Sequence, residues 1–142
     1  MALFRRCYVN VTAQIDTLIV THDVKRVFNE ADVESGLLQV FVPVGTVGVA
    51  LLENDSKIYE EYKKLIESQV PITTEKRPDR RSGSGRVYAH LRAQLVGHTL
   101  QIPIAEKKLQ LSPWQEVILF DFDDKIGRRE FFISVLSSGG EG

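Results

Sequence analysis

The sequence predicts an α+β fold in which an antiparallel β-sheet or sandwich carries two to three helices. Segments with the pattern of strands outnumber those with the pattern of helices, and hairpin-length connections join several of the strands. The regular alternation of strand and helix that indicates a doubly wound parallel sheet is missing. With 142 residues and 43% apolar content, the chain is expected to form a single domain over residues 1–136.

The N-terminal segments predict two strands and a helix. Residues 4–11 alternate loosely and are rich in β-branched side chains, and residues 16–20 form a second candidate strand. Thr21 is a suitable N-cap for a helix that continues through Ala31. Apolar residues at i, i+3, i+4 and i+7 would give this helix one buried stripe, formed by Val24, Val27, Phe28 and Ala31.

The most apolar segment runs from Gly36 to Leu52. Glycine and proline interrupt it, and it is short for a membrane span, which needs ~20 apolar residues. We therefore expect two buried strands, 37–44 and 47–52, after a turn at Ser35-Gly36, and no association with a membrane.

A second helix is predicted after these strands. Asp55 or Ser56 can act as its N-cap, and the helix reaches about Ser68, just before Pro71. Charged residues occupy most of its solvent side. Its predicted apolar face consists of Ile58, Tyr62, Leu65 and Ile66.

Residues 75–86 show no hydrophobic periodicity. They carry five basic and two acidic side chains, so we expect a mobile surface loop. A short third helix follows and ends at Gly97. Its predicted apolar stripe consists of Val87, Leu91 and Leu95.

The C-terminal part predicts three more strands. A turn at 124–128 would join the last two, and residues 137–142 are expected to form a disordered tail. The predicted strands are 99–104, 116–122 and 130–136.

Charge and cysteine content narrow the functional class. A formal net charge of -1 disfavours a nucleic-acid-binding protein, which is usually basic. Cys7 is the sole cysteine, so no intrachain disulfide can form, and a reduced cytoplasmic location fits. Residues 1–9 contain no apolar core of signal-peptide length.

The segment between His90 and Asp121 holds the most informative pattern. An amphipathic stretch at 90–97, His-Leu-Arg-Ala-Gln-Leu-Val-Gly, ends at a glycine, and a strand follows it. Residues 111–121, Leu-Ser-Pro-Trp-Gln-Glu-Val-Ile-Leu-Phe-Asp, then present Trp-Gln in a turn before a second strand. This order resembles the YjbQ-like family of small proteins, whose members have been called secondary thiamine-phosphate synthases. The resemblance covers residues 37–136.

The resemblance implies an α+β sandwich that assembles as a homotrimer, with a polar site near the subunit contacts. The implied reaction joins a pyrimidine diphosphate to a thiazole phosphate with loss of pyrophosphate. Such chemistry needs cations or hydrogen-bond donors around the pyrophosphate, and usually a metal held by carboxylates or imidazoles.

This chain departs from the family pattern at polar positions. Where the family has His-Thr-Ser-Ala, residues 45–48 read Gly-Thr-Val-Gly, so only the threonine matches. The family's Asn-Glu is reversed in Glu53-Asn54, and its Asp-Asp pair falls on Gly85-Arg86, ahead of the matching His90. Replacing the histidine removes a ligand and a proton carrier, and replacing the acidic pair disfavours a cation. We therefore expect no cofactor and no resident metal, with a divalent metal as the alternative.

His90 is the predicted catalytic residue, acting as a general acid, a phosphate donor or a metal ligand. The alternative is a solvated or structural histidine. Arg86 could bind phosphate directly where the family would use a metal. The predicted ligand-binding residues match the family pattern or lie beside His90, and they are Arg86, Thr46, Trp114, Gln115 and Asn54.

Several of these features also have structural interpretations. Trp114 could pack at a strand junction while Gln115 bonds to the backbone, or both could border a small-molecule pocket. The basic side chains of the 75–86 loop could be a solvated face or an anion site. Arg128-Arg129 is expected to pair weakly with Asp123-Asp124 at the surface.

Three functions stay open. The favoured one is a non-catalytic homotrimer that binds a phosphorylated or anionic small molecule in the inherited cleft. The first alternative is a thiamine-phosphate synthase-like enzyme with His90 as acid or base and Arg86 as anion clamp. The second is an interaction protein whose basic loop meets an acidic partner or nucleic acid.

Overall fold

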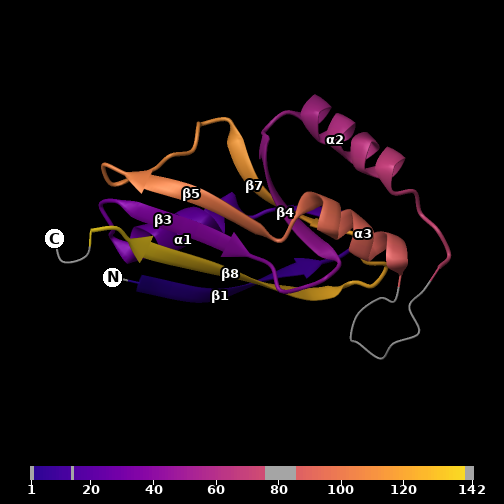
Figure 1. The fold of residues 1–142 in the computed structure, drawn as a ribbon, viewed down its shortest axis with the longest axis horizontal. Helices are drawn as coiled ribbons and strands as arrows, with labels where there is room; N and C mark the ends of the chain where they lie inside the picture. The colour runs from indigo at the N-terminus through magenta and orange to yellow at the C-terminus, as the bar shows by residue number, and fades with distance from the viewer. Residues whose placement is uncertain (1, 14, 76–85, 140–142) are drawn as a thin grey trace.

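The computed structural model describes residues 2–13, 15–75 and 86–139. It contains helices and two antiparallel sheets, which confirms the predicted α+β class (Figure 1). The larger sheet has five strands in the order β1 (Ala2–Val11), β8 (Gly127–Ser137), β3 (Gly36–Phe41), β5 (Thr99–Ala105) and β6 (Lys108–Leu109). The smaller has three, in the order β2 (Asp16–Ile19), β7 (Gln115–Asp121) and β4 (Val47–Glu53). The helices are α1 (Thr21–Ala31), α2 (Ser56–Gln69) and α3 (Val87–Val96).

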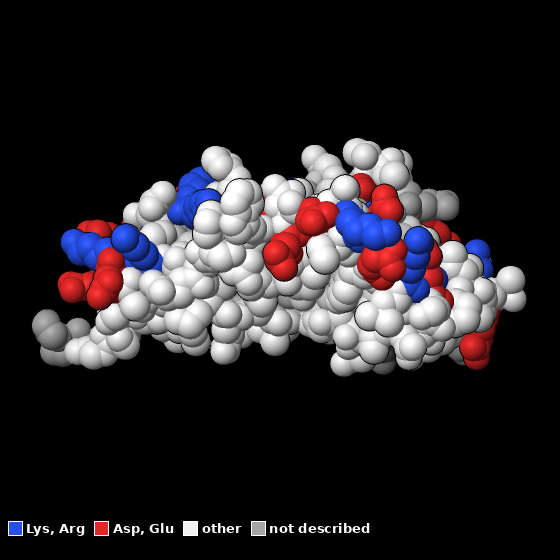
Figure 2. All heavy atoms as spheres, turned by 90° about the horizontal axis from the view of Figure 1, so that it is seen from above, with Lys and Arg blue, Asp and Glu red and all other residues white. Residues whose placement is uncertain are grey.

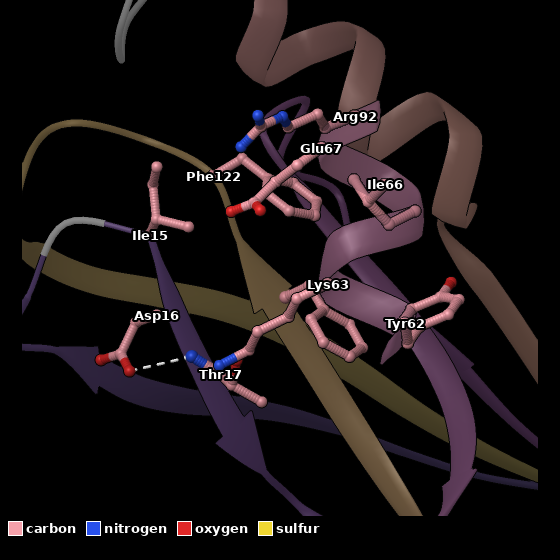
Figure 3. A pocket seen from close by; sticks show the side chains of 10 residues that line it. Ile15, Asp16, Thr17, Tyr62, Lys63, Ile66, Glu67, Arg92 and Phe122 are labelled. Atoms are coloured by element: carbon pink, nitrogen blue, oxygen red, sulfur yellow. Dashed lines mark hydrogen bonds between the residues drawn. The ribbon is translucent and has the colours of Figure 1, made fainter. Parts of the chain in front are cut away.

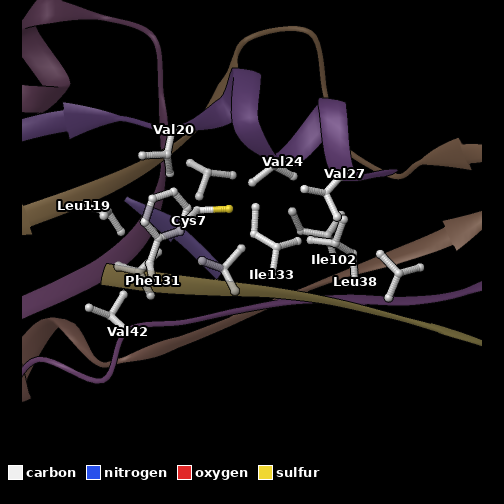
Figure 4. Close-up of a cluster of buried hydrophobic side chains, with 14 of the residues drawn as sticks. Cys7, Val20, Val24, Val27, Leu38, Val42, Ile102, Leu119, Phe131 and Ile133 are labelled. Atoms are coloured by element: carbon white, nitrogen blue, oxygen red, sulfur yellow. The ribbon is translucent and has the colours of Figure 1, made fainter. Parts of the chain in front are cut away.

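Strand β7 separates two hydrophobic cores. Val117 and Leu119 point into the first core, between the five-stranded sheet and a layer formed by α1 and the smaller sheet (Figure 4). Ile118 and Phe120 point into the second core, beneath α2 and α3. Because side chains alternate along a strand, a strand buried on both faces reads as a continuous apolar run. β8 has one face in the core, so its buried side chains alternate: Phe131, Ile133 and Val135.

The two N-cap predictions have different outcomes. Asp55 is the N-cap of α2, and its carboxylate accepts a hydrogen bond from the Lys57 N–H at 2.8 Å. Thr21 as the cap of α1 is wrong, because Val20 occupies that position. The buried Thr21 hydroxyl instead accepts a 2.9 Å hydrogen bond from the Val117 N–H, which ties α1 to β7.

The predicted apolar faces of α2 and α3 are wrong in part. On α2, Ile66 is buried and Tyr62 half-buried, but Ile58 and Leu65 are exposed. On α3, Leu91 and Leu95 are each 52% exposed, and the buried residues are Tyr88, Ala89, Arg92 and Ala93.

Close approach to β4 explains the orientation of α3. A Cβ at Gly48 would lie 2.7 Å from the Cβ of Val96, so glycine allows the end of the helix to lie against the strand. Small alanines on the buried face bring the helix near the sheet, and the larger leucines face outward. Gly97 ends α3 with a φ of 102°, as predicted, and its N–H donates to the Ala93 carbonyl.

The C-terminal strands differ from the predicted arrangement. β7 and β8 do not form a hairpin, because residues 122–126 carry the chain from the smaller sheet to the larger one. β8 includes Ser137, and the Ser138 N–H donates to the Ser35 carbonyl at 3.0 Å, so the predicted tail begins too early. Residues 140–142, like 76–85 of the predicted loop, lie outside the described residues. In the described part of the chain, none of the helices combines the length and apolar character needed to cross a membrane.

Candidate functional site

A hollow of about 260 Å³ lies where the two sheets meet beside α3. It brings together the loop before β4, one turn of α3, the segment after β7 and the start of β8. Its lining residues are Val44, Gly45, Thr46, His90, Asp123, Arg128 and Arg129. We call it the anion cavity. Two of the predicted site residues, Thr46 and His90, therefore lie in one cavity although they are far apart in the sequence.

The loop before β4 positions Thr46 and leaves room for His90. The Val47 N–H donates to the Val44 carbonyl at 3.1 Å, which closes a turn around Gly45 and Thr46. A Cβ on Gly45 would lie 2.9 Å from Nδ1 of His90, so glycine allows the imidazole to sit against the loop backbone. Where the family pattern has a histidine, this chain has Gly45, and the His90 imidazole lies against its backbone.

Two buried carboxylates lie at the cavity: Asp123 lines it, and Asp121 lies next to Asp123. Asp121 is fully buried, and its Oδ2 accepts a hydrogen bond from Nε of Arg129 at 2.5 Å. Burial raises the pKa of the Asp121 carboxyl, while hydrogen bonds from the Asp123 backbone N–H and from Arg129 act to lower it. The Thr46 hydroxyl donates to Oδ2 of Asp123 at 3.4 Å, and the Lys125 N–H donates to its Oδ1 at 3.1 Å.

Arg129 has a different environment from the one expected. It is only 9% exposed, its Nη2 donates to the Lys125 carbonyl, and the same nitrogen lies 4.0 Å from Oδ2 of Asp123. The expected weak surface contact is thus wrong for Arg129, which forms a buried ion pair with Asp121. The strand crossing between the sheets buries this pair.

Arg128 is the exposed cation of the anion cavity. Its guanidinium carbon lies 4.3 Å above the centre of the Tyr8 ring, within the range of a cation–π contact. This contact orients the guanidinium without neutralising its charge. Arg128 and the His90 imidazole thus line the same cavity from β8 and α3.

Arg86 lies outside the lining of the anion cavity. It is half-buried just before α3, and its Nε donates to Oδ2 of Asp124 at 3.0 Å. The structure therefore directs this guanidinium toward a carboxylate. Arg128 takes the position at the cavity that the sequence suggested for Arg86.

Asn54, Trp114 and Gln115 lie at the opposite end of β4 and β7 from Thr46. Eight strand steps from Thr46 to Asn54 correspond to roughly 25 Å. The Asn54 N–H donates to the Trp114 carbonyl at 2.6 Å, and Oε1 of Gln115 accepts from the Ser112 N–H at 2.9 Å. Gln115 has its predicted backbone partner, but Trp114 does not pack at the junction, because it is 68% exposed.

Among the described residues, no group of three or more His, Cys, Asp or Glu side chains is placed to hold a metal ion. Asp123 and His90 both line the anion cavity, and a metal would need at least one further ligand there.

Arg128, Arg129 and Asp123 are the charged lining residues that the sequence did not predict as parts of a site. The two arginines follow Gly127 directly, a pattern that is typical of an ordinary turn with solvated charges. The assumption of a β7–β8 hairpin placed these residues at a loop tip, whereas the crossing between sheets directs them into the cavity.

Comparisons with known proteins agree with this fold. The family model described as UPF0047 protein YjbQ-like matches residues 5–138. A UPF0047 protein of Archaeoglobus fulgidus is 28% identical over 116 residues, covering 82% of this chain and 88% of that protein.

Two solved structures are similar over nearly their whole length. A YbjQ-like protein of unknown function from Sulfolobus solfataricus has a TM-score of 0.84 at 21% identity, covering 97% of this chain and 99% of that one. An uncharacterized conserved protein of the yjbq/upf0047 family from Clostridium acetobutylicum has a TM-score of 0.78 at 26% identity, covering 93% and 99%. The chain belongs to the YjbQ-like, or UPF0047, family.

Proposed function

We propose that this protein is a cytoplasmic homotrimer that binds a phosphorylated or otherwise anionic small molecule in the anion cavity, with catalysis weakened or lost. The observation that carries the proposal is the meeting of Arg128, His90 and Thr46 around one hollow. Arginine binds phosphate and carboxylate oxygens through its planar fork, and imidazole and hydroxyl groups add donors.

Among the charged groups at the cavity, Arg128 supports the binding of an anion. Arg129 offsets Asp121, and both oxygens of Asp123 already accept hydrogen bonds, from Thr46 and Lys125. Arg128 has its contact with the neutral Tyr8 ring. A ligand phosphate would thus add a counter-charge at the cavity opening.

The residue at position 45 supports weakened or lost catalysis. Glycine supplies neither a metal ligand nor a proton carrier. In the reaction that the family resemblance implies, the negative charge of the leaving pyrophosphate must be stabilised by such groups. His90 is then the acid or base that the cavity retains.

Thermal unfolding with excess pyrophosphate tests the proposal. For wild type, a ligand at 100 times its Kd adds about 2.7 kcal/mol to the native state, which raises Tm by several degrees. We expect Arg128→Ala and His90→Ala to lose most of that shift. Arg26→Ala is the matched control, because Arg26 is an exposed arginine on α1 with its own partner, Asp23. No shift for wild type would contradict the proposal and favour an interaction protein.

Because His90 lines the cavity and could act as an acid or base, a thiamine-phosphate synthase-like enzyme is the second candidate function. Turnover of the pyrimidine diphosphate and thiazole phosphate by wild type, abolished in His90→Ala, would establish an enzyme. Pyrophosphate binding without turnover would support the binding function.

The outer face of the larger sheet supports assembly. Phe4, Phe41 and Leu136 are exposed there, and the Phe132 ring centre lies 5.2 Å from that of Phe4 and 6.2 Å from that of Phe41. Figure 2, seen from the side of β5 and α2, shows Lys, Arg, Asp and Glu mainly on the upper part of the view and at its ends. The Arg6 guanidinium carbon lies on the same face, 5.7 Å from the Phe4 ring centre and 5.1 Å from that of Phe132. Exposed aromatic side chains next to an arginine are typical of protein contacts.

A further inference from the structure

A second pocket, separate from the anion cavity, lies between α2 and the β2–β7 edge of the smaller sheet (Figure 3). Its volume is about 200 Å³. Apolar walls come from Ile15, Tyr62, Ile66, Phe120 and Phe122, and polar groups from Asp16, Thr17, Lys63, Glu67 and Arg92. We call it the Arg92 pocket, and we propose that it binds a small monocarboxylate with an apolar body, an aromatic ring or a branched alkyl group.

Arg92 is the residue that points to a ligand. It is only 2% exposed, yet within the described part of the chain its guanidinium forms no ion pair. Its Nε donates to the Val70 carbonyl at 2.8 Å, and its carbon lies 5.2 Å from the Tyr88 ring centre and 6.0 Å from that of Phe122. Buried charges in proteins are normally paired, and the carbonyl and the two rings offset only part of the cost.

The geometry leaves the two Nη groups for the ligand. The hydrogen bond from Nε to Val70 and the contacts of the guanidinium with the Tyr88 and Phe122 rings orient this group at the pocket wall. Figure 3 shows Arg92, Glu67 and Phe122 toward one end of the pocket, and Asp16, Thr17 and Lys63 toward the other. A planar carboxylate matches two parallel N–H groups, which makes bidentate binding favourable.

The rest of the pocket selects a single negative charge. Glu67 and Asp16 would repel a phosphate, which carries close to two charges, more strongly than a monocarboxylate. Aromatic and aliphatic walls suit an apolar body beyond the carboxylate. An apolar cavity of ~150 Å³ holds benzene, so a pocket of this size admits a six-membered ring with one substituent.

The Arg92 pocket and the anion cavity use opposite sides of the same segments. His90 and Arg92 are two residues apart on α3, and Phe122 and Asp123 are neighbours after β7, but each pair divides between the two hollows. Binding in one can therefore be removed without removing groups from the other.

Nitrogen-15 NMR titration with benzoate, phenylacetate and 3-methylbutanoate tests the proposal. We expect saturable binding that shifts the Arg92 side-chain Nε–H signal and the amides of 15–17 and 62–67. Arg92→Met keeps the stem and removes the fork, so it should weaken benzoate binding roughly tenfold or more. Glu67→Gln should tighten benzoate binding, because it removes a like charge at the pocket, and leave binding of neutral benzamide unchanged.

Two further variants keep the test decisive. Thr17→Phe fills the pocket from β2 and should abolish benzoate binding even if Arg92→Met fails to fold, and His90→Ala should leave benzoate binding as in wild type. The proposal is overturned if none of the three carboxylates binds at millimolar concentration, if benzamide binds as tightly as benzoate, or if inorganic phosphate displaces benzoate. Shifts confined to residues of the anion cavity would also overturn it.

Discussion

At the end of β7, Asp121 and Arg129 join the two sheets through a buried ion pair. Asp121 belongs to the smaller sheet and Arg129 to the larger one, so their contact fixes the corner where the anion cavity forms. The desolvation of both charges is offset by their close contact and by the additional bonds to Lys125 and Asp123. If Asp121 is removed, Arg129 still has the Asp123 carboxylate 4.0 Å from its Nη2, whereas Asp121 has only Arg129 as a cation among the ion pairs of the described residues.

Substitution of one partner should be more damaging than substitution of both. Arg129→Met leaves the buried Asp121 carboxylate without its cation, and we expect a loss of about 3–5 kcal/mol in the free energy of unfolding. The double variant Arg129→Met/Asp121→Leu should recover at least half of that loss. Urea unfolding at one protein concentration measures both, and equal losses for the single and double variants would show that the pair itself is stabilising.

Helix α3 shows, at the scale of an element, where sequence patterns succeed and fail. Gly97 correctly predicted the C-terminal end of α3, because a positive φ favours glycine whatever the surroundings. Its buried face was wrongly predicted, because Ala89, Ala93 and Arg92 carry little or no apolar signal and Tyr88 was left out of the predicted stripe, while Leu91 and Leu95 are exposed. Which face of α3 is buried depends on its close approach to Gly48 of β4, a tertiary contact that the sequence of the helix does not contain.

The packing of α3 gives a prediction with an internal control. Ala89 is fully buried, so Ala89→Leu should overfill the space against β4 and lower the free energy of unfolding by about 1–3 kcal/mol. Leu91→Gln, two residues away on the exposed face, should change it by less than about 0.5 kcal/mol. Thermal or urea unfolding of the two variants checks the assignment, and the opposite ranking would mean that the predicted leucine stripe is the buried one.

At the scale of the whole molecule, the strands were largely predictable and their order was not. Alternating or continuous apolar runs located the long strands to within a few residues, since those patterns are local. The pairing of β8 with β1 and β3, and the separation of β7 from β8, depend on contacts between distant segments. For the same reason Thr46 and His90 could be suggested by resemblance to a family, while Arg128 required the structure.

The exposed sheet face gives a prediction about assembly. We expect light scattering to report a trimer for wild type and a smaller species for Phe132→Asp, because a charge placed between Phe4 and Phe41 opposes burial of that face. Lys25→Asp, an exposed substitution on α1, should leave the trimer intact. A monomeric wild type would contradict the proposed assembly.

The place of β8 has a consequence for how the chain reaches its native state. β8 lies between β1 and β3, and its pairing with β1 joins residues at least 116 positions apart, as in Val11 with Gly127. β1 therefore cannot be joined to the rest of the larger sheet until residues 127–137 are available. Contacts of such long range are slow to form because a large loop must close first. We expect the segments around β7 to collapse early, while β1 and β3 each keep one unpaired edge. Cooperative folding of the larger sheet then requires β8 to pair with both strands.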